Sequence, residues 1–269
     1  MSEWLFLWGA CAAYALAGSI ALGSLRRESA PERALLAIHV AALALHATSI
    51  ALRWARVSHG PFLTLFEILS SNIWSLALLF TLAYVRWRAV RPAAAVVLPI
   101  LIVMIAWMLA TDAGPGHFPA TYATLWLWVH VAMGKVFLGA VLVAVGISGV
   151  VLLRARGLGA RSFERLPASE KLEVLAFRFM VVGFLFESLM LVAGAIWAQD
   201  AWGRYWAWDP LETWAFITWV SLAAFIHARI AFRVAPTAGA LMVMGVFVLA
   251  FLTFFGVPFV STAPHQGAI

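Results

Sequence analysis

The residues best suited to chemistry lie in one short segment that is rich in aromatic rings. Five aromatic side chains fall between Trp202 and Trp214, and the same segment holds Arg204, Asp209 and Glu212. Flat rings and charges crowded between two long apolar runs are suited to binding a flat, partly charged ligand. The alternative is a membrane helix that begins here with interfacial tryptophans, which are common where a membrane meets water.

The second half of this segment is typical of a helix start. Asp209 fits the N-cap position, Pro210 fits the first helical position, and Glu212 follows the cap by three residues. We therefore interpret Asp209 and Glu212 as structural caps rather than as acid–base catalysts. A cap requires neither Trp206 nor Trp208, so the tryptophans favour the ligand-binding interpretation.

The histidines are the candidate metal ligands, since a neutral imidazole is the commonest metal ligand in proteins. Ionisable residues inside membrane spans are rare and usually functional. We therefore sort the histidines by their expected depth in the membrane. Loop solvation explains His59 and His117. The seven histidines are His39, His46, His59, His117, His130, His227 and His265.

His130 and His265 form the first candidate pair. His130 follows Tyr122, the expected start of its helix, by eight residues, which is roughly 12 Å along a helix. His265 lies in the tail after the last apolar run. Both can reach the face that carries the tryptophans, and two imidazoles beside a flat aromatic surface predict a haem with His130 and His265 as axial ligands. The alternative is that each is an interfacial or packing histidine.

His227 belongs to a different depth. It follows Pro210 by seventeen residues, roughly 25 Å along a helix, so it is expected near the opposite membrane face. A second, inner metal site there needs another ligand, which could come from His39, from His46 or from a partner subunit. For His39 and His46 the alternative is helix packing.

The elements that position these residues must be those of a membrane protein. The chain of 269 residues is 64% hydrophobic and 11% charged, with a mean hydropathy of +0.96, whereas soluble domains carry about 25% charged residues. The one cysteine, Cys11, excludes an internal disulfide and a CxxCH haem-attachment motif. The net charge of +6 is attributed to topology signals and lipid contacts rather than to nucleic acid. No basic segment precedes the first apolar run, so we expect it to be retained as a span.

Eight apolar runs are long enough to span a bilayer. The sequence therefore predicts an all-α, polytopic membrane helix bundle that forms one integral membrane domain over residues 1–269, with an external tryptophan-rich loop at residues 198–213. The predicted runs are Trp4 to Leu25, Ala34 to Leu52, Phe66 to Val85, Ala93 to Ala110, Tyr122 to Leu153, Val174 to Trp197, Pro210 to Phe232 and Ala238 to Val257.

Arginine and lysine in the loops predict the orientation, because cytoplasmic loops carry an excess of both. The loops after the first, third, fifth and seventh runs are the basic ones, so they are assigned to the cytoplasm. Both termini and the tryptophan-rich segment then face outward, from a bacterial inner membrane or, in a plastid, a thylakoid membrane. Arg53 and Arg56 depart from this rule and are expected to have a role on the outer face.

The tryptophan-rich segment resembles the CcsA (ResC) family of cytochrome c assembly proteins, haem-handling membrane proteins marked by a Trp-Trp-Asp signature. The resemblance covers the last four runs and extends to Arg53-Trp54 and Ser58 to Ser70, whereas the first runs match only in hydropathy. The signature residues are Trp202-Gly203, Trp206, Trp208-Asp209, Glu212-Thr213-Trp214 and Ile217-Thr218-Trp219.

The resemblance implies a cofactor and its ligands. In the family, haem b is bound over the tryptophan-rich loop between two histidines, which correspond to His130 and His265. A membrane histidine that corresponds to His227 serves an inner haem site, usually with a partner's histidine. The other residues implied to contact the cofactor are Trp202, Trp206, Trp208, Arg204, which would pair with a propionate, and Asp209.

The resemblance also implies a function: a haem-handling subunit of a cytochrome c synthase, acting in a haem lyase complex. It would move haem to the outer face and present it to the CxxCH segment of apocytochrome c for thioether attachment. The implied partners are a CcsB (ResB)-like membrane protein, apocytochrome c and membrane lipid. The alternatives are haem delivery to a separate chaperone, as in CcmC proteins, and an electron-transfer membrane subunit with permanent bis-histidine haem. A transporter of another substrate has only Pro99, inside the fourth run, in its favour.

Overall fold

The computed structural model describes residues 2–26, 31–60, 63–116, 120–159, 163–164 and 166–260. Within these residues, eight helices are long and apolar enough to cross a membrane, so the predicted all-α membrane bundle is confirmed. The elements in chain order are α1 (Ser2–Ser24), α2 (Glu32–Val57), α3 (Leu65–Arg86), η1 (Arg88–Ala93), α4 (Ala94–Leu109), η2 (Ala120–Tyr122), α5 (Leu125–Ala155), α7 (Ser169–Trp202), α8 (Pro210–Ala231), α9 (Pro236–Phe251), the π-helical turn η3 (Leu252–Gly256) and α10 (Val257–Val260).

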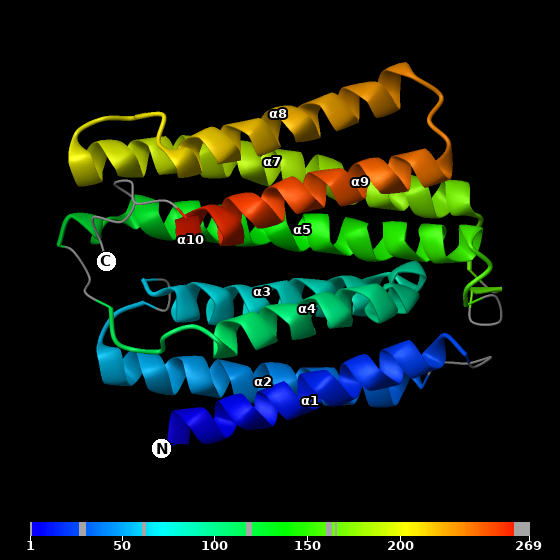
Figure 1. Cartoon of the computed structure of the whole chain (residues 1–269), viewed down its shortest axis with the longest axis horizontal. Helices are drawn as coiled ribbons and strands as arrows, with labels where there is room; N and C mark the ends of the chain where they lie inside the picture. Colours follow the sequence, from blue (N-terminus) through cyan, green and yellow to red (C-terminus); the bar gives the residue numbers. More distant parts are fainter. Residues whose placement is uncertain are drawn as a thin grey trace.

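The connections between the helices gather at two ends of the bundle (Figure 1). One end carries the start of α1, the α2–α3 connection, the α7–α8 connection and α10. We call it the tryptophan end, because the loop at residues 203–209 lies there. Because the number of spans is even, the start of the first described helix and the end of the last one lie at the same end, as the predicted topology requires. That this end faces away from the cytoplasm remains a prediction from the loop charges.

The observed helix bounds differ from the predicted ones at several helices, including α2, which ends at Val57 rather than at Leu52, and the two long helices α5 and α7. Helix α5 begins at Leu125 rather than at Tyr122, because the side chain of Thr124 caps it by accepting a hydrogen bond from the Leu127 N–H. Helix α7 begins at Ser169 rather than at Val174 and ends at Trp202 rather than at Trp197, so it extends beyond the predicted apolar run at both ends. A helix can extend beyond the apolar run when its polar residues find partners, and Glu173 pairs with Arg229 of α8.

Helix α5 is the central helix of the bundle and packs against α3, α4, α7 and α9. Glycines allow this close approach, as small residues do in membrane helix interfaces. A Cβ atom on Gly139 would lie 2.2 Å from a side-chain carbon of Leu79 on α3, and one on Gly146 would lie 2.7 Å from Val97 on α4. The core of the bundle therefore lies along α5, and α5 also carries His130.

A buried charge cluster joins α1, α2 and α3 at the tryptophan end. Arg53 is 5% exposed, and its Nε donates to Glu67 at 2.9 Å. Another of its nitrogens donates to the backbone carbonyls of residues 113 and 114. Arg56 forms two hydrogen bonds with Glu3 of α1. The two arginines that depart from the positive-inside rule thus form ion pairs at this end, which gives both of them a structural role there.

His39 and His46 pack inside the α1–α2–α3 unit. The ring of Tyr14 stands edge-on to both imidazoles, with ring centroids 5.5 and 6.0 Å apart. His46 hydrogen-bonds the hydroxyl of Ser70, and His39 lies 3.4 Å from the Ala77 carbonyl oxygen. Helix α2 lies on one side of the bundle and α8, which carries His227, on the other (Figure 1). The structure therefore does not bring either histidine together with His227.

We expect Arg53→Met to lower the free energy of unfolding by about 3–5 kcal/mol, because it leaves the buried Glu67 carboxylate without its cation. Thermal unfolding of the protein in detergent measures this. The matched control is Arg91→Met, whose partner Glu32 is 46% exposed, so the expected loss is about 1 kcal/mol or less. Equal losses in the two variants would show that the Arg53 cluster does not stabilise the bundle.

Candidate functional site

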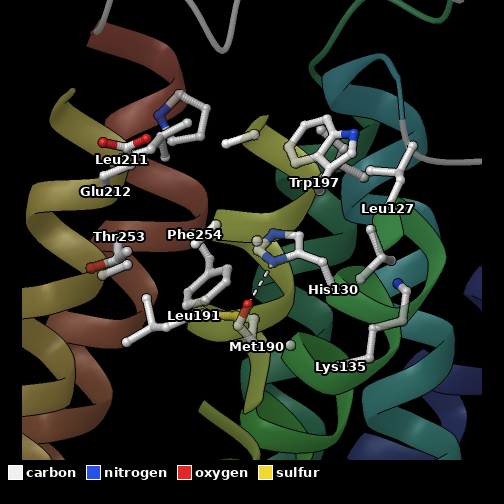
Figure 2. Close-up of a pocket in the computed structure, with 18 of the residues that line it drawn as sticks. Leu127, His130, Lys135, Met190, Leu191, Trp197, Leu211, Glu212, Thr253 and Phe254 are labelled. Atoms are coloured by element: carbon white, nitrogen blue, oxygen red, sulfur yellow. Dashed lines mark hydrogen bonds between the residues drawn. The ribbon is translucent and has the colours of Figure 1, made fainter. Parts of the chain in front are cut away.

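A cavity of about 310 Å³ lies at the tryptophan end between α3, α5, α7 and the start of α8 (Figure 2). Apolar side chains such as Leu127, Leu191 and Phe254 form most of its wall, and few polar groups reach it. A mainly apolar cleft with a few placed polar groups is the usual form of a small-molecule site. The polar residues that line it include Ser71, Asn72, His130, Lys135, Asp209 and Glu212.

His130 lies in this cavity with its ring orientation fixed. Its Nδ1 donates a hydrogen bond of 2.9 Å to the backbone carbonyl of Met190 on α7 (Figure 2). A neutral imidazole that donates from Nδ1 carries its lone pair on Nε2. Metal-ligating histidines commonly donate their second ring nitrogen to a carbonyl or carboxylate, which fixes the tautomer. The bond to the Met190 carbonyl therefore assigns the proton to Nδ1, a tautomer that metal-ligating histidines commonly have.

Two further residues of α7 determine where this ring lies. A Cβ atom on Gly194 would lie 2.7 Å from Nδ1 of His130, so a larger residue there would displace the imidazole. The indole of Trp197 stacks on the ring of His130, with centroids 5.9 Å apart and planes inclined by 24°. Met190, Gly194 and Trp197 are spaced by four and three residues, which places them on one face of the helix. This face of α7 forms the seat of the imidazole.

The loop between α7 and α8 is held by the predicted capping box, which the structure confirms. Asp209 accepts a hydrogen bond of 2.8 Å from the backbone N–H of Glu212. Glu212 in turn accepts from the N–H groups of Ala207, at 2.7 Å, and of Asp209, at 3.4 Å. Both carboxylates are buried and line the cavity. Within the segment predicted as a loop at 198–213, only residues 203–209 are non-helical.

The three tryptophans named from the sequence occupy different positions. Trp206 lines the cavity, and its buried indole N–H has no acceptor among the described residues. Trp202 ends α7 and packs on Trp197, with ring centroids 5.0 Å apart. Trp208 is 65% exposed, and its ring stands edge-on to Trp206 at 5.6 Å. Its φ of 58° is rare for a residue other than glycine, and backbone strain of this kind clusters at functional sites.

The other predicted site residues do not line the cavity. Arg204 is exposed in the loop. His227 is exposed on α8, four residues before the end of that helix, so it lies toward the opposite end of the bundle from His130. His265 and His117 lie outside the described residues.

Sequence reasoning missed several residues that line the cavity or shape it. Lys135 is an ionisable residue inside an apolar span, and this signal by itself marks a candidate functional site. Gly194 and Trp197 carry no comparable signal in the sequence, because their contacts with the His130 ring depend on how α7 packs against α5. The same holds for Met190, which contributes a backbone carbonyl that any residue could supply.

Comparisons with known proteins identify relatives over most of the chain. The family described as cytochrome c assembly protein matches residues 34–265. The cytochrome c biogenesis protein CcsA of Synechococcus sp. (strain CC9902) is 31% identical over 239 residues, which cover 78% of each chain. CcsA of Parasynechococcus marenigrum (strain WH8102) is 32% identical over 211 residues, 68% of this chain and 69% of that protein.

A solved structure shares the fold. The cytochrome c haem lyase CcmF superposes with a TM-score of 0.74 at 22% sequence identity, over 94% of this chain. This chain matches 46% of the length of the CcmF chain, so the likeness concerns the helix bundle. Together with the sequence matches, it agrees with the resemblance that the tryptophan-rich segment carries. The chain therefore belongs to the cytochrome c assembly protein family, and its role lies in cytochrome c maturation.

Proposed function

We propose that this chain handles haem: it binds haem b in the cavity at the tryptophan end and presents it to the CxxCH segment of an apocytochrome c. The observation that carries the proposal is the imidazole of His130, whose Nδ1 is engaged by the Met190 carbonyl inside an apolar, ring-lined cavity. In this proposal the chain lies in a bacterial inner membrane or in the corresponding plastid membrane. The tryptophan end faces away from the cytoplasm, on the side where apocytochromes receive haem.

The residues present fit a metalloporphyrin better than a bare metal ion. Among the described residues, no group of three or more His, Cys, Asp or Glu side chains could hold a metal ion. A macrocycle brings its own four nitrogen ligands, so one or two imidazoles complete the iron coordination. Trp206 and Trp197 offer ring surfaces beside His130, and Trp206 in turn contacts the exposed ring of Trp208. His265 is our proposed second axial ligand.

The chain's own contribution is positioning. When bound, the haem supplies iron and the vinyl groups to which cysteine thiols add. His130 would hold the iron, Trp206 would pack on the ring from the cavity wall, and Trp202 and Trp208 beside it would help to exclude water. Arg204, on the exposed loop, is placed to meet a propionate or an acidic partner. Asp209 and Glu212 hold the loop in the conformation that presents these rings. The chain thus acts as the haem-presenting part of a cytochrome c haem lyase complex.

A second haem site at His227 completes the proposal. His227 is exposed on α8, whereas His39 and His46 belong to α2 on the other side of the bundle. His39 and His46 are enclosed between α1, α2 and α3, so they cannot serve as its second ligand. A CcsB-like membrane partner that packs on α8 would supply the missing histidine. Haem would enter at this site and move to the His130 site.

The two alternative functions make different demands. A permanent bis-histidine electron-transfer subunit needs histidines that face each other across helices, whereas the buried described histidines His39 and His46 lie on one helix. His130 and His227 lie toward opposite ends of the bundle. Delivery to a haem chaperone, as in CcmC proteins, would use the same cavity. It would differ from presentation to apocytochrome c only in its product. A chaperone with bound haem, rather than a holocytochrome with thioether bonds, would identify that function.

We expect His130→Ala to remove most of the bis-histidine haem signal in the reduced-minus-oxidised spectrum of the purified protein, because it removes an axial ligand. His59→Ala is the control, since His59 does not line the cavity. Full haem occupancy in His130→Ala, with an unchanged spectrum, would contradict the assignment of the cavity as the haem site.

We expect Gly194→Ala to weaken haem binding about tenfold, because the added methyl group displaces the His130 ring from its bond to Met190. The loss of one oriented hydrogen bond is worth roughly 1–1.5 kcal/mol. Haem titration followed by absorbance measures the change. Gly245→Ala is the matched control, because its added Cβ atom meets nothing within 4 Å. If the two variants bind haem equally well, the fixed imidazole is not needed for binding.

We expect His227→Ala to lower the haem content of the complex with the membrane partner while leaving haem bound through His130 in the isolated chain. The reason is that His227 reaches no other described ligand within this chain. Haem content per polypeptide, measured for both preparations, tests this. A loss of haem from the isolated chain alone would place His227 in a site that needs no partner.

A further inference from the structure

Lys135 is the one lysine inside the membrane-spanning part of α5. The chain contains two lysines, Lys135 and Lys171, and Lys171 is exposed near the start of α7. Lys135 is half-buried and lines the cavity together with His130 (Figure 2). Its ammonium group donates a hydrogen bond of 3.1 Å to the hydroxyl of Ser71 and lies 3.5 Å from Oδ1 of Asn72, both on α3. These contacts orient the charge without neutralising it.

Among the described residues, no carboxylate forms an ion pair with Lys135, whereas the arginines enclosed by the bundle pair with glutamates. The two acidic residues in the same cavity, Asp209 and Glu212, are engaged in capping α8. Glu187 of α7 is buried as well, but it does not line the cavity. A cation held in a largely apolar membrane cavity is costly unless an anion compensates it. The cavity therefore holds one amine whose positive charge, when it is protonated, is not balanced by an ion pair with any described carboxylate.

The position of this charge relative to His130 indicates what could balance it. Lys135 follows His130 by five residues on α5, which is about 7.5 Å along the helix axis. Both residues line the same cavity, so a porphyrin whose iron is bound by His130 could extend an acid side chain to Lys135. Lys135 is also deeper in the bundle than His130, whereas Arg204 lies outside the cavity on the loop.

We propose that Lys135 is a carboxylate-binding residue of this cavity, which receives a propionate of the haem whose iron His130 binds. This inference rests on the proposed function and adds a ligand contact to it. Ser71 and Asn72 hold the ammonium group in place, and the ligand carboxylate forms a charge-assisted hydrogen bond with it. The acid-bearing edge of the porphyrin then faces the inner end of the cavity, and Arg204 on the exposed loop is left for an acidic partner rather than for a propionate.

The test compares two probes on the detergent-purified full chain: iron protoporphyrin IX as the free acid, and its dimethyl ester, which has no carboxylate charge. Absorbance titrations give the affinity for each. We expect the wild type to bind the free acid at least about tenfold more tightly than the ester, as for a hydrogen bond to a charged group. Lys135→Met removes this preference by weakening only the binding of the free acid, and Lys135→Arg retains it.

Two control variants show whether the preference for the free acid comes from Lys135 or from another cation. Lys171→Met changes the only other lysine, at a site remote from the cavity, and leaves the preference intact. Arg204→Gln measures the part that the exposed loop cation contributes. If Lys135→Met does not fold, Arg204→Gln decides the question, because the preference persists in that variant when Lys135 supplies it and is lost when the loop cation does. A preference abolished by Arg204→Gln but unchanged in Lys135→Met would overturn the proposal, as would a wild type that binds both probes equally.

The same measurements distinguish failure of this inference from failure of the proposed function. Haem that binds the wild type and is lost in His130→Ala supports the cavity as a haem site, whatever Lys135 does. If neither probe binds the wild type, or if His130→Ala binds both normally, the haem site itself is wrong, and the role of Lys135 falls with it.

Discussion

The close approach of α5 and α7 at the tryptophan end is the contact on which the candidate site depends. Gly194 lets the two helices come near enough for Nδ1 of His130 to reach the carbonyl of Met190. This carbonyl already belongs to a helix, so its position is fixed by α7 as a whole. One hydrogen bond therefore sets the ring orientation and the tautomer of His130 together. The stacked indole of Trp197 packs against the same ring.

Several charged groups enclosed by the bundle have partners of opposite charge. Arg53 lies between Glu67 and backbone carbonyls at the tryptophan end, and Arg229 pairs with Glu173 toward the other. These pairs tie neighbouring helices together, because each joins two elements that would otherwise meet only through apolar contacts. Lys135 differs from them, since its contacts are hydroxyl and amide groups. Lys135, which has no carboxylate partner among the described residues, lies in the same cavity as the candidate metal ligand His130.

The two halves of the bundle have different roles in this arrangement. Helices α1 and α2 form a unit with α3 that encloses His39, His46 and Tyr14 and anchors the Arg53 cluster. Helices α5, α7 and α8 build the cavity, with α3 contributing one wall. The tryptophan loop is attached to the second half through Glu212, which accepts hydrogen bonds from the loop and caps α8. A ligand in the cavity would thus contact both the helices and the loop.

The amino-acid sequence by itself determined the membrane class, the eight spans, the capping box at Asp209 and Glu212, and the family, because these depend on local hydropathy, short spacings and a distinctive motif. It also identified His130 as a candidate ligand from its depth along one helix. Only the tertiary structure decided which groups meet. Met190, Gly194 and Trp197 reach His130 from a helix about 60 residues away in the chain, Lys135 turns toward α3, and His39 and His46 turn away from His227. Such contacts depend on how helices rotate and pack against one another, and hydropathy alone does not specify that rotation, since all sides of a membrane helix are apolar.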